Sequence, residues 1–268
     1  MSSSPVILVT GASSGIGAAT ARLFAQKGYR VSLAARRIER LQSLADEIQS
    51  LGGQALPVAT DVSRLEDVQN VVQATLERFG QIDVLFNNAG FGRLNWLENL
   101  DAEKDVKAQV LVNILGVIWM SQAVLPHMME RRQGHIINMS SMAGLVATPT
   151  YTVYAATKFA VRGFTEALRR DVRIYGIRAS GIYPGGVETE FGEIAGYHRT
   201  TRVAMPKLLT LSAEAVARSV WGLVKWPRRV HVVPWLMNIG VWSNAGLPWL
   251  LDWVMERMFV IPERNGKR

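Results

Sequence analysis

The chain has 268 residues, of which 49% are hydrophobic. This length suits one large α/β domain or two small ones, and the apolar share is ample for a continuous core. The absence of cysteine excludes disulfides, thiolate metal sites and cysteine nucleophiles, and it fits a reducing compartment. The net charge of +8 is spread along the chain without a dense basic cluster, so nucleic acid is not an expected partner. The N-terminal Met-Ser-Ser-Ser-Pro lacks the features of a secretory signal, so we expect a cytoplasmic protein.

A glycine-rich turn stands near the N-terminus. Val6-Ile7-Leu8-Val9 predicts a strand that is buried on both faces, and residues 18–27 have helical periodicity. Between them lies Thr10–Gly17, whose glycines have the spacing G-x-x-x-G-x-G. Glycines let the backbone approach a pyrophosphate, and a helix N-terminus offers free N–H groups. We therefore predict a dinucleotide site, and the alternative is a structural turn without a ligand. The candidate ligands are Gly11, Ser13, Ser14, Gly15, Ile16 and Gly17.

The residues after the second strand, Val31–Ala35, indicate which dinucleotide is bound. An acidic residue at this place would hydrogen-bond the ribose 2′-hydroxyl of NAD, whereas an arginine accommodates a 2′-phosphate. The sequence has Arg36 and Arg37 and no acid before Glu39. Guanidinium groups suit a phosphate dianion, so we predict NADP(H) with Arg36 and Arg37 as ligands. The alternative is that both arginines only extend over the start of the next helix.

The third strand, Ala55–Ala59, follows a predicted helix whose apolar face is formed by Leu41, Leu44, Ala45 and Ile48. It leads into Thr60-Asp61-Val62. Asp61, with Val62 beside it, is a candidate for binding the adenine, because ligands bind at the carboxyl ends of such strands. The alternative is that Asp61 or Ser63 caps the next helix, which contains Val68, Val71 and Val72.

The fourth strand, Ile82–Phe86, opens into Asn87-Asn88-Ala89-Gly90. Small residues let a cofactor approach, and asparagine amides can join neighbouring strand ends, so Asn88, Ala89 and Gly90 are cofactor candidates. A long helical stretch follows from about Ala102 to Met129 and contains Asn113. Asparagine is a poor residue inside a helix, and its apolar neighbours predict that Asn113 points inward.

Tyr154 and Lys158 lie four residues apart on a predicted helix that runs to about Tyr175. Residues at this spacing share a helix face. A nearby cation favours phenolate and lowers a tyrosine pKa from about 10, which would make Tyr154 an acid–base group. The alternative is an ordinary surface pair. The helix follows the fifth strand, Gly134–Met139, and Ser140-Ser141, and it precedes the sixth strand, Ile177–Tyr183.

Strand and helix alternate from residue 6 to residue 183. This alternation predicts an α/β fold with one doubly wound parallel sheet, in a single domain that comprises residues 1–268. Each candidate residue lies at the carboxyl end of a strand or on the helix after it, where such sheets bind ligands. No metal site is predicted.

Together these motifs resemble the short-chain dehydrogenase/reductase family over about 180 residues. The resemblance implies a Rossmann-type core, hydride exchange between a nicotinamide and a carbonyl or alcohol, and a homo-oligomer. It implies that Tyr154 donates or accepts the proton and that Ser141 hydrogen-bonds the substrate oxygen. It implies that Lys158 holds the nicotinamide ribose and that Asn113 anchors a water. It also places Pro184, Gly185, Val187 and Thr189 at the cofactor, with Val187 and Thr189 at the carboxamide.

Residues 190–211 predict a mobile lid over the substrate. The segment is mostly apolar, which favours a lipophilic or aromatic carbonyl, and the alternative is that these side chains only pack on the core. Its apolar residues are Phe191, Ile194, Tyr197, Met205, Leu208 and Leu209, beside Arg199 and Arg202.

The C-terminal extension, residues 234–268, follows the predicted seventh strand Val230–Val233 and is rich in tryptophan. Residues 232–251 are uncharged and long enough to cross a bilayer, but Pro234 and Pro248 argue against a spanning helix. We favour an extension that packs on the domain, caps the substrate pocket or contacts another subunit. The alternative is peripheral contact with an anionic membrane. The flanking basic residues are Arg228, Arg229, Arg257, Arg264, Lys267 and Arg268.

The leading functional prediction is therefore an NADPH-dependent carbonyl reductase or alcohol dehydrogenase. A lipid- or steroid-directed dehydrogenase at a membrane surface and a non-catalytic dinucleotide sensor are the alternatives.

Overall fold

Seven parallel strands form one sheet in the computed structural model, which describes residues 4–196 and 210–265. Their order across the sheet is β3-β2-β1-β4-β5-β6-β7. The order reverses between β1 and β4, as in a doubly wound α/β fold, so the predicted fold class is confirmed. The strands are β1 (Val6–Thr10), β2 (Arg30–Ala35), β3 (Gln54–Ala59), β4 (Val84–Asn87), β5 (Gly134–Met139), β6 (Ile177–Pro184) and β7 (Val230–Val233).

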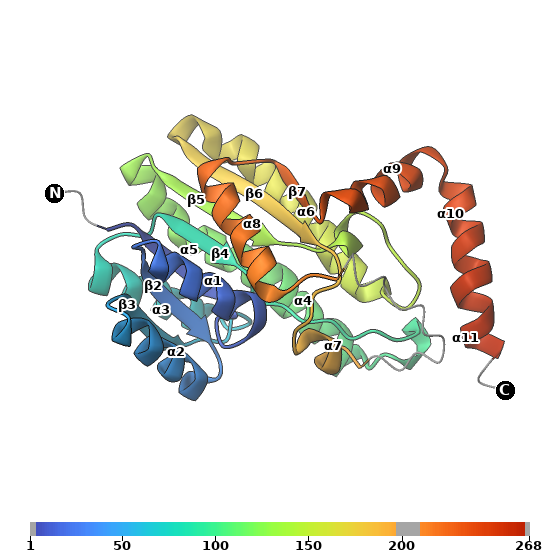
Figure 1. Ribbon diagram of the computed structural model, residues 1–268, viewed down its shortest axis with the longest axis horizontal. Helices are drawn as coiled ribbons and strands as arrows, with labels where there is room; N and C mark the ends of the chain where they lie inside the picture. Colours follow the sequence, from blue (N-terminus) through green and yellow to red (C-terminus); the bar gives the residue numbers. More distant parts are fainter. Residues whose placement is uncertain (1–3, 197–209, 266–268) are drawn as a thin grey trace.

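Helices cover both faces of the sheet (Figure 1). The first strand shows why, since Ile7 and Val9 pack into the core on one face and Leu8 packs into the core on the other. Both cores bury apolar residues almost completely, which stabilises the three layers. One face carries α1 (Gly15–Gln26), α2 (Ile38–Ser50) and α8 (Ala213–Lys225), and the other carries α3 (Leu65–Phe79), α5 (Gly116–Arg131) and α6 (Thr152–Val172).

The predicted long helix is one helical run, Ala102–Arg131, but part of it is π-helical. It is long and apolar enough to cross a membrane by composition, with a mean hydropathy of 1.7 in its most apolar window. Its C-terminal half packs against β4, β5 and α3, so we attribute its apolarity to core packing. The run consists of η2 (Ala102–Lys107), α4 (Ala108–Val110), η3 (Leu111–Leu115) and α5.

The remaining elements are short helices. Two of them lie after the carboxyl ends of strands, since η4 follows β5 and α7 follows β6. They are η1 (Leu97–Asn99), η4 (Met142–Gly144), η5 (Arg173–Tyr175), α7 (Phe191–Ile194), η7 (Trp235–Met237), α9 (Asn238–Gly246), α10 (Pro248–Met255), η8 (Glu256–Val260) and α11 (Ile261–Asn265).

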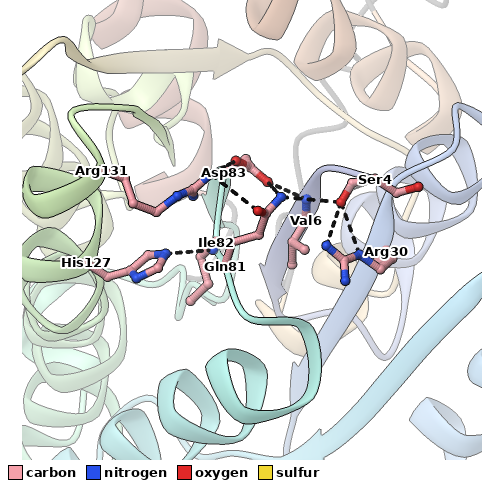
Figure 2. A network of polar contacts seen from close by, with 8 residues as sticks. All are labelled: Ser4, Val6, Arg30, Gln81, Ile82, Asp83, His127 and Arg131. Atoms are coloured by element: carbon pink, nitrogen blue, oxygen red, sulfur yellow. Dashed lines mark hydrogen bonds and ion pairs between the residues drawn. The ribbon is translucent and has the colours of Figure 1, made fainter. Parts of the chain in front are cut away.

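Asp83 organises a polar network at the amino ends of the strands (Figure 2). Its carboxylate accepts hydrogen bonds from the backbone N–H of Val6 at 2.7 Å and from Arg131 at 3.0 Å. The side chain of Gln81 donates a third, at 2.8 Å. The network joins β1, the start of β4 and the end of α5. Because ligands bind at the opposite, carboxyl ends of such sheets, we regard it as structural.

Some predicted boundaries and one alternative are wrong. The first helix begins at Gly15 instead of Ala18, and the fourth strand is Val84–Asn87 instead of Ile82–Phe86. Neither Asp61 nor Ser63 caps α3, because Arg64 is the N-cap residue and makes no side-chain capping bond. The Tyr154 helix ends at Val172, followed by a 3₁₀ turn. These shifts leave every candidate residue at the same edge of the sheet.

Candidate active site

The glycine turn after β1 closely approaches α1 and leaves the helix terminus free. A Cβ at Gly17 would lie 2.2 Å from the carbonyl oxygen of Gly11, so only glycine fits there. Gly11 itself has a φ of 66°, in the left-handed region. Ser14 is the N-cap of α1, but its side chain makes no capping hydrogen bond. The first-turn N–H groups therefore remain available to an anion, as a dinucleotide pyrophosphate requires.

Asn88 and Thr10 join the ends of β4 and β1. The amide of Asn88 donates to the carbonyl oxygen of Thr10 at 3.0 Å. The Thr10 hydroxyl oxygen accepts from the backbone N–H groups of Asn88 and Ala89, both at 3.0 Å. Asparagine therefore ties the strand ends together as expected, and Ala89 and Gly90 are held beside the glycine turn.

Arg37 lies over the serines of the turn and pairs with the segment after β6. Its guanidinium donates to the hydroxyl oxygens of Ser13 at 3.0 Å and Ser14 at 2.8 Å. It also pairs with Glu190 at 3.0 Å, and Arg40 pairs with the same carboxylate at 2.6 Å. Hydrogen bonds from Arg40 and Arg37 lower the pKa of Glu190 to about 2. Arg36 is exposed and forms no ion pair with a described residue.

Asp61 follows β3 at the same edge of the sheet. Its side chain accepts hydrogen bonds from the backbone N–H of Ser63 at 3.0 Å and from the Ser63 hydroxyl at 2.6 Å. Its own backbone N–H donates to Asp67 at 2.9 Å. These bonds hold the strand end rigidly. Val62 beside it is buried and packs against Gly116.

Tyr154 and Lys158 lie one turn apart on α6, as their spacing predicts. The ammonium of Lys158 is 5.6 Å from the centroid of the Tyr154 ring. It donates to the carbonyl oxygen of Met139, at the end of β5, at 3.1 Å. Lys158 is only 4% exposed, and burial lowers its pKa to about 8. The two side chains are buried together, so the surface-pair alternative is wrong.

The two serines after β5 have different surroundings. Ser140 is buried, and its hydroxyl donates to the carbonyl oxygen of Lys158 at 3.0 Å. Ser141 is only half-buried, and its oxygen accepts from the backbone N–H of Ala143 at 3.1 Å. Ala143 packs in the same cluster as Tyr154. Ser140 is therefore a structural residue, whereas the Ser141 hydroxyl retains its proton for another acceptor.

Asn113 is fully buried inside the π-helical segment η3, so the prediction that it points inward is confirmed. Its amide oxygen accepts from the backbone N–H of Phe91 at 3.0 Å, and its amide nitrogen donates to the carbonyl oxygen of Phe91 at 2.8 Å. A further bond to the Thr157 hydroxyl, at 3.1 Å, reaches α6. Asn113 thus joins the loop after β4 to the Tyr154 helix. π-helical segments often mark functional sites.

An apolar cluster surrounds the Tyr154 ring. Phe191, from the first turn of the predicted lid, lies 5.5 Å from it and Tyr151 lies 6.0 Å from it, measured between ring centroids. Leu94 and Ala195 complete the cluster. The other lid residues, Tyr197, Arg199, Arg202, Met205, Leu208 and Leu209, and the side chain of Ile194, lie outside what the structure describes.

The segment after β6 approaches the glycine turn. The methyl group of Thr189 lies 3.1 Å from where a Cβ at Gly15 would stand. Val187 bridges to Leu211 and packs on the core, and the backbone N–H of Gly185, after Pro184, donates to Val233 at 2.8 Å. The structure therefore brings the predicted residues to one edge of the sheet, around the point where its order reverses.

Sequence reasoning missed two contributors to this edge, Thr157 and Glu190, and it included Thr10 in the glycine turn without its side-chain role. Thr10 was visible only as the last residue before the glycines, and Thr157 only as the neighbour of Lys158. Nothing in the local pattern connects Glu190 with an arginine 153 positions earlier.

Comparison with known proteins identifies the family. The model of the short chain dehydrogenase family matches residues 5–198. The chain belongs to the short-chain dehydrogenase family. A relative from Listeria monocytogenes, an uncharacterized oxidoreductase, is 39% identical over 231 residues, which cover 85% of this chain and 93% of the relative. The chain is therefore an oxidoreductase of the short-chain dehydrogenase family.

Two solved structures that are similar to this chain carry different cofactors. A short-chain dehydrogenase/reductase from Burkholderia phymatum, in complex with NAD, has a TM-score of 0.83 and 29% identity over 93% of this chain and 95% of that chain. An alcohol dehydrogenase from Thermococcus sibiricus, complexed with 5-hydroxy-NADP, has a TM-score of 0.75 and 32% identity over 85% of this chain and 94% of that chain. These similar structures therefore do not indicate whether this chain binds NAD or NADP.

Proposed function

We propose that the protein interconverts a carbonyl and an alcohol with NADP(H), and that Tyr154 transfers the proton. The observation that carries this proposal is the buried Lys158 ammonium beside the Tyr154 ring. It lies at the strand edge that also holds the open helix terminus of α1. A buried cation next to a phenol favours negative charge on the phenol oxygen, which suits an acid–base group.

The residues around the glycine turn fit a dinucleotide. Gly11 and Gly17 leave no room for side chains, and the N-terminus of α1 is uncapped. In this proposal Lys158 would hold the nicotinamide ribose. When bound, the nicotinamide would supply or accept the hydride.

Side chains of the protein stabilise the charge on the substrate oxygen and supply its proton. As a carbonyl is reduced, negative charge grows on its oxygen, and hydroxyl groups directed at it stabilise that charge. Ser141 retains a free hydroxyl proton for this purpose, and Tyr154 donates its proton to the same oxygen. Asn113 holds α6 against the loop after β4, which keeps Tyr154 in place. The aromatic surroundings of Tyr154 favour a lipophilic substrate.

The preference for NADP(H) over NAD(H) rests on Arg37. Its guanidinium lies over Ser13 and Ser14 and already binds a carboxylate, so an anion is accommodated there. No acidic side chain takes the place that would bind a ribose 2′-hydroxyl directly after β2, where Arg36 and Arg37 stand.

A spectrophotometric screen of NADPH and NADH oxidation against aldehydes and ketones tests both parts of the proposal. We expect turnover with NADPH and a preference over NADH of about tenfold or more, the value of one charge-assisted bond. Arg37→Gln should remove most of that preference, whereas the exposed Arg78→Gln should leave it unchanged.

Each failure in this screen has its own meaning. Equal use of NADH by the wild-type chain would overturn the NADP(H) assignment and leave the reaction standing. A chain that binds NADPH tightly but neither reduces any carbonyl nor oxidises any alcohol with NADP⁺ would instead be a dinucleotide sensor.

A further inference from the structure

The C-terminal arm, residues 235–265, exposes most of its large apolar side chains. Trp249 is 68% exposed and Trp253 is 56% exposed, and the other exposed apolar residues come from every part of the arm. Of the three favoured options for this segment, packing on the domain is therefore wrong for most of its length, and contact with another subunit stays a prediction. The further exposed side chains are Trp235, Leu236, Ile239, Trp242, Leu247, Leu250, Met258 and Ile261.

The arm is attached to the body near its two ends. At the first end, Met237 and Val241 pack against a small core that contains Tyr183. At the other end, Arg264 pairs with Glu98, and its guanidinium lies 3.8 Å from the centroid of the Trp96 ring. Between these contacts, α10 packs mainly against its neighbours α9 and η8. Figure 1 shows α9 leaving the end of the sheet and α10 projecting from the molecule.

An exposed helix of this composition needs a partner. Asp252 is the one charged residue of the eight in α10, and its apolar residues are not confined to a stripe that the body covers. Many exposed apolar side chains on one segment mark a protein or membrane contact. The uncharged stretch 232–251 does not span a bilayer as one helix, because it is divided among β7, η7, α9 and α10. The arm can therefore lie on a membrane surface but not cross it.

The charges around the arm favour an anionic partner. Residues 228–268 carry six basic and three acidic side chains, in a chain of net charge +8. Arg228 and Arg257 are exposed and form no ion pair with a described residue. A hollow of about 250 Å³ at the root of the arm places Arg228 beside two indole rings, Trp235 and Trp242. Tryptophan and arginine together are typical of segments that lie at the membrane interface.

We propose that the arm binds the surface of anionic phospholipid membranes. Tryptophan side chains would enter the interfacial region, and the exposed Arg228 and Arg257 would face the lipid phosphates. A second copy of this chain is the less favourable occupant, because it would bring two surfaces of like charge together.

The arm's last contact bears on the substrate. Arg264 and Glu98 join the arm to the chain segment after β4, which also provides Leu94 to the cluster around Tyr154. An arm on a membrane would thus hold this side of the molecule near the bilayer. If the proposed reaction is correct, its carbonyl or alcohol would be a lipid-soluble compound drawn from the membrane.

Vesicle flotation with the full chain tests the membrane proposal independently of the reaction. The probes are vesicles of phosphatidylglycerol and phosphatidylcholine mixed, and of phosphatidylcholine alone. We expect flotation with the mixed vesicles, and a loss of about tenfold or more in binding for the double variant Trp249→Ser, Trp253→Ser. Trp226→Ser is the matched control, because Trp226 is 75% exposed but lies outside the arm. It should float like wild type.

Sedimentation velocity without lipid completes the test. The double variant should keep the subunit number of the wild-type chain and its turnover of a water-soluble carbonyl. The proposal is overturned if the wild-type chain does not float with the anionic vesicles or if the double variant floats equally well. If the wild-type chain does not float and the double variant dissociates an oligomer, the arm is a subunit contact instead. Absence of turnover in the wild-type chain and in every variant would contradict the proposed reaction, and the flotation result would still decide the membrane proposal.

Discussion

Lys158 carries a charge in surroundings that disfavour it. The side chain is almost completely buried, and its ammonium donates a hydrogen bond to the carbonyl oxygen of Met139. Burial lowers its pKa from the ordinary 10.5 to about 8. Below pH 8 the ammonium is charged in both the folded and the unfolded chain, so the full cost of burying it applies. Between pH 8 and 10.5 the folded chain loses the proton first, and the cost declines.

The variant Lys158→Met should therefore be more stable than the wild-type chain while losing its activity. At pH 7, without cofactor, we expect a gain of about 2 kcal/mol in the free energy of unfolding, since one pKa unit corresponds to 1.36 kcal/mol and one hydrogen bond is lost. The gain should shrink between pH 8 and 10. Urea unfolding at pH 7 and pH 10 measures both values, with the exposed Lys107→Met as control. A variant less stable than wild type at pH 7 would contradict this account of Lys158.

At the scale of elements, β5 and β6 are joined by a buried histidine. Nε2 of His135, in β5, lies 2.9 Å from the Ser180 hydroxyl in β6. Burial, with a smaller contribution from Arg178, lowers the pKa of His135 to about 4. The unfolded chain takes up a proton near pH 6.5, whereas the folded chain does not do so until about pH 4. This histidine therefore makes the fold less stable as the pH falls through that range.

Acid should accordingly destabilise the wild-type chain more than a His135→Gln variant. Between pH 7 and pH 5 we expect the wild type to lose about 2 kcal/mol more, because pH 5 lies about 1.5 units below the pKa of the histidine in the unfolded chain and above its pKa in the folded chain. Urea unfolding at the two pH values gives the difference directly. Equal losses in the two chains would show that His135 does not titrate on unfolding.

Elements with a strong local pattern were predicted well. The fifth and seventh strands have their predicted bounds, and the predicted apolar face of α2 is its buried face. The π-helical segments were not predictable. Helical periodicity does not distinguish an α-helix from a π-helix, and the backbone around Asn113 follows side-chain bonds to Phe91 and Thr157. Those partners lie 22 and 44 residues away in the sequence.

At the scale of the whole molecule, the sheet explains why so much of the candidate site was visible in the sequence. Parallel strands end at one edge, so residues that follow successive strands come together whatever the details of the helices. The contacts that cover or expose a segment are not predictable in this way. Composition alone did not show that the tryptophans of the C-terminal arm stay exposed, nor that Glu190 pairs with Arg37. Both depend on the placement of distant parts of the chain.

The central claim is that Tyr154 transfers the proton while the rest of the edge binds the cofactor. The most direct test compares turnover and cofactor affinity in Tyr154→Phe, with Tyr175→Phe as a control, because Tyr175 precedes the amino end of β6, opposite the carboxyl edge that holds the site. Loss of general acid catalysis should lower the turnover of an accepted carbonyl by at least about 10²-fold and leave the NADPH dissociation constant within about threefold of wild type. Turnover within about tenfold of the wild-type value would contradict the claim.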